Sequence, residues 1–95
     1  MQLQDLARIL KDMYDRPVDS RMTTIGVARK PTMIHLFGIL YAREIDGCGD
    51  KPTRTAKEIA KKAGIGENYG TEIDKGRLLA EYVTVHDENV RRWRD

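Results

Sequence analysis

Apolar residues recur along residues 2–15 with the spacing of an amphipathic helix. They form one stripe that excludes the charged side chains of the segment: Leu3, Leu6, Ala7, Leu10, Met13 and Tyr14. The pair Arg16-Pro17 predicts the end of this helix, because proline disfavours helical backbone in the residue before it. We expect the stripe to pack on a central helix of the same chain, with a homodimer contact as the alternative.

Residues 32–46, TMIHLFGILYAREID, are apolar on almost every side before Arg43. Their length favours a buried central helix, although the Ile, Phe and Tyr residues keep a strand as the alternative. Thr32 is the predicted N-cap. Gly38 lowers the helix propensity but permits the close approach of another helix. We expect His35 to be a hydrogen-bonded histidine of the core or its boundary.

Residues 55–79, TAKEIAKKAGIGENYGTEIDKGRLL, predict two helices joined by a tight glycine turn. Thr55 and Glu58 fit a capping box at the start of the first helix. Gly64 can adopt the positive φ that ends a helix and redirects the chain. The expected buried positions of the pair are Ile59, Ala60, Ala63, Tyr69, Ile73, Gly76 and Ala80. This is the layout of a DNA-binding helix-turn-helix.

Two short segments rich in β-branched residues, 22–27 and 82–85, predict strands that could pair as a reduced wing. The tail after them suggests a short helix anchored by Val90 and Trp93. The pattern as a whole predicts a mainly α fold, with four helices, a helix-turn-helix at about residues 55–79 and one or two short β-strands. The 95 residues are enough for a single small domain with one core, residues 1–95.

The charge distribution says more about partners than the net charge of +2. Residues 47–66 carry five Lys or Arg against two acids, whereas residues 67–80 carry two bases against three acids. A positive first helix beside a nearly neutral second one suits phosphate contact by the first. For each lysine alone, a solvated surface position is the alternative.

The sequence offers little for other chemistry. Cys48 is the only cysteine, and two distant histidines with no cysteine partner do not predict a metal site. We find no Gly-rich phosphate loop, no nucleophile elbow and no carboxylate-x-lysine spacing, so we expect neither an enzyme nor a cofactor. The charged N-terminal segment is no signal peptide and no run of about 20 apolar residues exists, which predicts a cytoplasmic protein without a membrane span.

A helix-turn-helix would bind double-stranded DNA through two sets of side chains. The second helix reads base edges, and its outward positions here are Asn68, Thr71, Glu72 and Lys75. The phosphate contacts are expected from Arg54, Thr55, Lys57, Lys61, Lys62 and Arg77. Glu72 could accept a hydrogen bond from a cytosine amine or repel phosphate. The acids of this helix are the main argument against DNA binding.

The segment 55–79 resembles the helix-turn-helix of small prokaryotic and phage DNA-binding proteins. The matching residues are Ile59, Ala60, Gly64, Ile65 and Ile73. It departs from them at Gly70, where such motifs usually carry an apolar anchor. Through MIHLFGILYA and YGTEIDKGRLLAEYV, most of residues 32–85 also resembles small helix-turn-helix-like proteins of bacteria and phages. The resemblance implies a small transcription regulator, or an accessory module in a phage or defence setting.

The alternative is a protein–protein interaction module or inhibitor that keeps the helix-turn-helix scaffold without binding DNA. A DNA binder predicts a continuous positive face that joins Arg54, Lys57, Lys61 and Lys75. An interaction module predicts an exposed apolar patch, around Tyr82 or Trp93.

Overall fold

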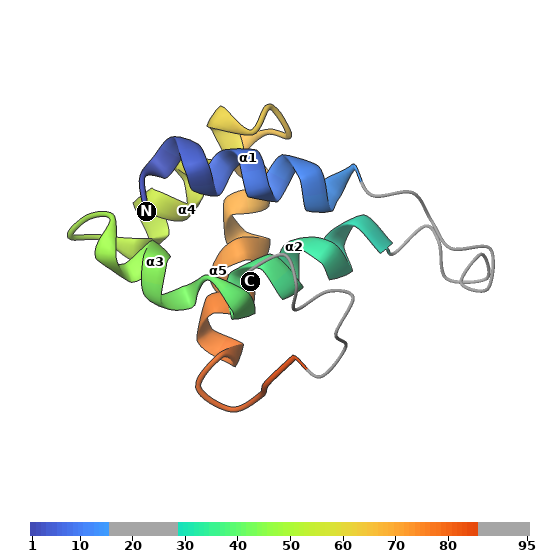
Figure 1. Ribbon diagram of the computed structural model, residues 1–95, viewed down its shortest axis with the longest axis vertical. Coiled ribbons are helices and arrows are strands. Elements are labelled where there is room, and N and C mark those ends of the chain that lie inside the picture. The colour runs from blue at the N-terminus through green and yellow to red at the C-terminus, as the bar shows by residue number, and fades with distance from the viewer. Residues whose placement is uncertain (16–28, 86–95) are drawn as a thin grey trace.

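Five α-helices and one short 3-10 helix form the described part of the chain, residues 1–15 and 29–85 of this computed structural model (Figure 1). In chain order they are α1 (Leu3–Tyr14), α2 (Arg29–Leu40), α3 (Ala42–Gly47), α4 (Pro52–Lys62), η2 (Glu67–Tyr69) and α5 (Gly70–Leu79). The predicted mainly α class is confirmed. No helix of the described residues has the length and apolar character needed to cross a membrane.

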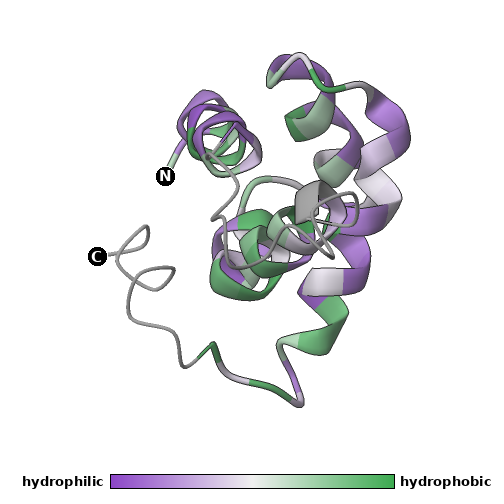
Figure 2. Cartoon of the chain, turned by 90° about the vertical axis from the view of Figure 1, so that its right-hand side faces the viewer, coloured by the Kyte–Doolittle hydropathy of each residue, from purple (hydrophilic) through white to green (hydrophobic). Residues whose placement is uncertain are grey.

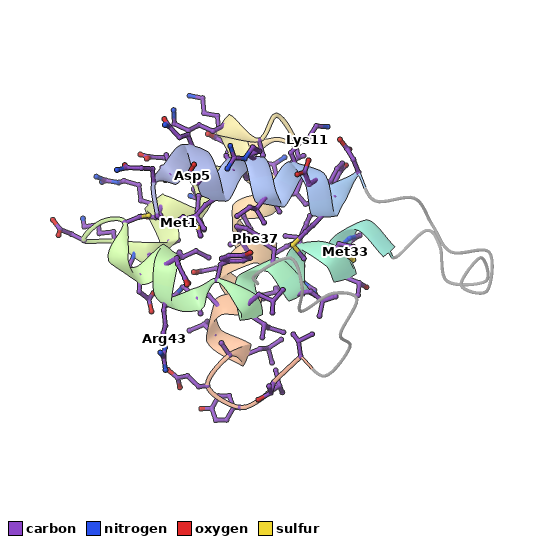
Figure 3. The ribbon with its side chains drawn as sticks, viewed as in Figure 1. Met1, Asp5, Lys11, Met33, Phe37 and Arg43 are labelled. Atoms are coloured by element: carbon purple, nitrogen blue, oxygen red, sulfur yellow. The ribbon has the colours of Figure 1, made fainter. Side chains whose placement is uncertain are left out.

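The core lies where α1, α2, α4 and α5 meet. Phe37 and Tyr41 stack with ring centroids 5.3 Å apart. Figure 3 labels Phe37 of α2 near the centre of the molecule. The largest fully buried side chains are Tyr41, Phe37, Leu6, Leu10, Met13, Ile34, Ile45, Ile59 and Ile73. Each stabilises the fold by roughly 1.5–3 kcal/mol through removal from water. The residues of the α1 stripe that are buried here, Leu6, Ala7, Leu10 and Met13, confirm the expected packing of this stripe inside its own chain.

The predicted helix over residues 32–46 exists but has different bounds. Helix α2 begins at Arg29, so Thr32 is not its N-cap, and Pro31 fits the first turn because the N–H it lacks has no partner there. The helix breaks at Tyr41, with φ −114° and ψ 21°, and resumes as α3. Tyr41 and Ile45, one on each side of the break, are both buried in the core.

Helix α4 starts at Pro52, so the capping box predicted at Thr55 is wrong. Proline is pre-organised for the first helical position, and the helix therefore begins one turn earlier than Thr55. The Thr55 backbone N–H donates to the Lys51 carbonyl at 3.0 Å as part of that turn. The Thr55 side chain is only 6% exposed.

Helices α2 and α5 cross with their backbones in direct contact at two glycines. A Cβ on Gly76 would lie 2.2 Å from the His35 carbonyl oxygen, and a Cβ on Gly38 would lie 2.4 Å from the Ile73 carbonyl oxygen. The close approach expected at Gly38 is confirmed. Gly70 makes a similar approach to α4, because a Cβ there would lie 2.9 Å from the Lys57 Cα. This contact explains why an apolar anchor is missing at Gly70.

The strand predicted at 82–85 is wrong, since these residues form a turn and irregular backbone. The N–H groups of Tyr82 and Val83 donate to the Leu79 carbonyl, at 2.8 and 3.0 Å, and so close the end of α5 instead of joining a sheet. The other predicted strand, 22–27, and the predicted tail helix with Val90 and Trp93 lie outside the described residues. Within residues 1–15 and 29–85 there is no strand.

Candidate nucleic-acid interface

The segment between α4 and α5 redirects the chain at two glycines. Gly64 has a φ of 79° and Gly66 a φ of 100°, and these are the positive-φ glycines of the described chain. The Gly64 N–H donates to the Lys61 carbonyl at 3.1 Å, which ends α4. Gly64 was expected to turn the chain and does so. Gly66 is a second turning point that the sequence analysis missed, although the spacing Gly-x-Gly was its signal.

Helix α4 presents a positive side to solvent. Arg54, Lys57 and Lys61 are exposed, and they project within about 60° of one another around the helix axis. None of the three has an ion-pair partner among the described residues. Lys62 is also exposed but projects about 140° from Lys57, toward the other edge of α4. The structure therefore brings three of the four predicted basic side chains of α4 together.

The first turn of α5 packs against α4 next to Lys57, at the edge of this exposed side. The Lys57 backbone contacts Gly70, and the Thr53 hydroxyl donates to the Asp74 carboxylate at 3.1 Å. Thr71 and Lys75 are exposed one turn apart on α5, and Asn68 is exposed on η2 just before it. Three of the four predicted base-contact residues therefore lie on the solvent side of the second helix.

Glu72, the fourth of these residues, points toward α2 and not outward, which does not favour the predicted base contact. Its carboxylate contacts the His35 imidazole of α2 through Oε2 and accepts a hydrogen bond from Lys75 Nζ at 3.3 Å through Oε1. The side chain is 26% exposed. The hydrogen bond to His35 lowers the pKa of Glu72, helped by Lys75 and opposed by burial. His35 is thus a hydrogen-bonded boundary histidine, as expected.

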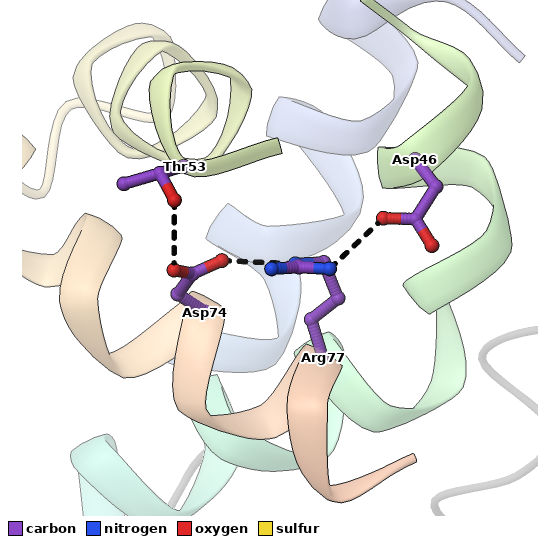
Figure 4. A network of polar contacts seen from close by, with 4 residues as sticks. All are labelled: Asp46, Thr53, Asp74 and Arg77. Atoms are coloured by element: carbon purple, nitrogen blue, oxygen red, sulfur yellow. Dashed lines mark hydrogen bonds and ion pairs between the residues drawn. The ribbon is translucent and has the colours of Figure 1, made fainter. Parts of the chain in front are cut away.

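The position of Arg77 does not favour the predicted phosphate contact. Its side chain is 17% exposed and lies between two carboxylates (Figure 4). Its Nε donates to Asp74 at 2.9 Å and its Nη1 donates to Asp46 at 3.1 Å. Burial acts to lower the pKa of Arg77, but the hydrogen bond and charge of Asp74, together with Asp46, outweigh it and raise that pKa. Arg77 therefore ties α5 to α3.

The position of Thr55 does not favour the predicted phosphate contact either, because this residue is buried inside the fold. Its hydroxyl oxygen lies close to the loop between α3 and α4, where a Cβ on Gly49 would be 3.3 Å away. In the described residues no three His, Cys, Asp or Glu side chains come together in a way that could hold a metal ion.

These contacts change the electrostatics of the second helix. Glu72 and Asp74 both have partners inside the chain. Glu72 contacts His35 and Lys75, and Asp74 pairs with Arg77. Of the three acids in residues 67–80, Glu67 remains exposed without an ion-pair partner in the described structure. Because Lys75 and Arg77 pair with Glu72 and Asp74, Glu67 is the unpaired charge of this segment among the described residues, and the unpaired positive charge of the helix pair lies on α4.

An apolar surface also lies at the far end of α5. Leu78, Leu79, Tyr82 and Val83 are exposed, with Tyr82 at 81%. Figure 2 shows this hydrophobic stretch at the end of the helix and in the segment that follows it. An exposed patch around Tyr82 was the feature expected of a protein-interaction module.

Comparison with known proteins gives one match, to a family model that covers most of the chain. No curated protein and no solved structure matches it. A family model described as an HTH-like domain matches residues 2–86, which include every helix described above. The chain belongs to the family of HTH-like domains.

Proposed function

We propose that the chain binds double-stranded DNA through α4, η2 and α5, as a small regulator or accessory module in a prokaryotic or phage setting. In this arrangement α4 lies along the phosphate backbone and the first turns of α5 enter the major groove. Arg54, Lys57 and Lys61 contact phosphates, and they are exposed on one side of α4. The base-edge contacts come from Asn68, Thr71 and Lys75. An Asn side chain suits adenine and a Lys side chain suits guanine.

The observation that carries the proposal is the neutralisation of the α5 acids inside the fold. A carboxylate that faces phosphate would oppose binding, and the sequence places three acids in this segment. Glu72 is drawn toward α2 by His35, and Asp74 is held by Thr53 and Arg77. The exposed negative charges that remain beside the Lys and Arg side chains of α4 are those of Glu58 and Glu67.

Fluorescence anisotropy with a labelled duplex of mixed sequence tests the proposal, across salt from about 50 to 200 mM. Binding should weaken with salt, with a log–log slope of about −0.9 for each phosphate neutralised. The double variant Lys57→Gln/Lys61→Gln should flatten that slope by roughly 1.8. The matched control is Arg8→Gln/Lys11→Gln, which removes two positive charges from α1, where both pair within the helix. An equal loss of slope in both variants would refute the assigned face.

The exposed patch of Leu78, Leu79, Tyr82 and Val83 supports a second candidate function, a protein-interaction module. The same titration separates the two functions. Wild-type protein that fails to bind duplex DNA at low salt would favour the interaction module. In that case Tyr82→Ser, at a side chain whose removal leaves the core intact, becomes the variant with which to test partner capture.

A further inference from the structure

One carboxylate behind the candidate recognition surface is shared between a histidine and a lysine. Oε2 of Glu72 contacts Nε2 of His35, while Oε1 of Glu72 accepts from Nζ of Lys75 at 3.3 Å. Lys75 is 59% exposed and stands one turn after Thr71 on the solvent side of α5. The two interactions draw on the same negative charge, so the state of one affects the strength of the other.

The backbone holds this group in place. His35 belongs to α2, and its carbonyl oxygen lies against Gly76 of α5, where even a methyl group would not fit. Glu72 is one turn before Gly76 on the same helix. The imidazole and the carboxylate are therefore kept within reach by a fixed crossing of two helices.

We infer that His35 and Glu72 are positioning residues for Lys75, and that protonation of His35 releases Lys75 for contact with DNA. The inference rests on the proposed DNA-binding function. With a neutral imidazole, Nε2–H donates a hydrogen bond to Glu72, and the carboxylate keeps its full attraction for the Lys75 ammonium. With a protonated imidazole, His35 itself neutralises the carboxylate. Lys75 is then held less strongly and the surface gains one positive charge.

Proton uptake by this group is therefore linked to DNA binding, and acidification strengthens binding. An imidazole is the side chain that ordinarily changes charge between about pH 8 and pH 5. Helices α1, α3 and α5 pack against α2, and within the described residues Glu72 of α5 contacts His35, while Lys75 contacts Glu72. Three ion pairs of α1 and α3 join groups other than His35: Asp5–Arg8, Lys11–Asp15 and Asp46–Arg77. The remaining charged side chains of these two helices are Asp12, Arg43 and Glu44.

The test is the anisotropy titration repeated at about pH 8 and about pH 5.5, at fixed ionic strength. Wild-type affinity should rise several-fold at the lower pH, and the salt slope should steepen by up to about 0.9 as one more phosphate is neutralised. Glu72→Gln should bind at pH 8 about as tightly as wild type binds at pH 5.5, because Lys75 is no longer held. Lys75→Gln should lose the pH-dependent gain.

The second histidine of the chain supplies the matched control. His86→Gln should keep the pH-dependent gain, and His35→Gln should lose it. A structural role alone would lower affinity at both pH values in Glu72→Gln and would not flatten the profile.

A wild-type protein that binds DNA equally at both pH values would refute the inference and leave the proposed function standing. A gain that persists in Lys75→Gln would also refute it. Absence of duplex binding at either pH would instead refute the proposed function, and this inference with it.

Discussion

Replacing Gly76 by Ala should destabilise the protein, although alanine is the better helix former. The new Cβ would lie 2.2 Å from the His35 carbonyl oxygen and 3.1 Å from the Gly38 Cα. An ordinary contact is 3.4 Å or more, so the helices must separate by about 1 Å. The obstacle is backbone, which no rotamer change can remove.

The magnitude follows from two opposed effects. Alanine gains about 1 kcal/mol of helix propensity over glycine. Overpacking of a tight contact costs roughly 1–3 kcal/mol and occasionally more, and here the strain spreads along the whole crossing of α2 and α5. We expect a net loss of about 2 kcal/mol, which lowers the melting temperature of a chain of this size by roughly 10 °C. Thermal and urea unfolding followed by far-UV circular dichroism would measure it.

Gly47→Ala is the control for the Gly76 variant. Gly47 also lies in a helix, as the last residue of α3, but a Cβ there meets nothing within 4 Å. It should leave stability unchanged or raise it by a few tenths of a kcal/mol. If Gly76→Ala proved as stable as the wild type, the close crossing of α2 and α5 would be refuted.

Three further outcomes follow from the polar contacts and the exposed patch. Arg77→Met leaves Asp74 and Asp46 without their shared partner and should lower the free energy of unfolding by about 1–3 kcal/mol in urea titrations, and an unchanged midpoint would contradict the tie between α5 and α3. The pKa of Glu72 is lowered in the folded state, so its stabilisation is present above pH 4.5 and is lost as the pH falls through the folded pKa. Glu72→Gln should therefore flatten the acid side of the stability-against-pH profile. Tyr82→Ser changes a side chain that is 81% exposed and should shift the free energy of unfolding by less than about 0.5 kcal/mol.

Helix content could be predicted from the sequence where a segment carries its own periodicity. The stripe of α1 repeats over three turns, and Leu6, Leu10 and Met13 are buried as the pattern implies. In α2 the apolar residues leave no polar face, so length was the argument for a helix, and it was correct. Both predictions rest on residues close together in the chain.

Helix starts were less predictable, because several start signals compete within a few residues. Pro52, Thr53 and Thr55 can each begin a helix, and a capping box is a stronger local pattern than a single proline. The helix begins at Pro52, and Thr55 is then buried inside the fold near Gly49, a tertiary contact that the local sequence does not contain.

The acids of α5 show why the sequence alone does not tell which charged side chains of a segment are paired. The pair Asp74–Arg77, three residues apart on one helix, was visible in the sequence. The other partners are not: Thr53 is 21 residues from Asp74, and His35 is 37 residues from Glu72. Both distant partners depend on glycines, Gly70 for the approach of α5 to α4 and Gly76 for its approach to α2. The same small residues that weaken α5 as an isolated helix therefore bring its carboxylates to their partners, and they leave Lys75 and Thr71 on its solvent side.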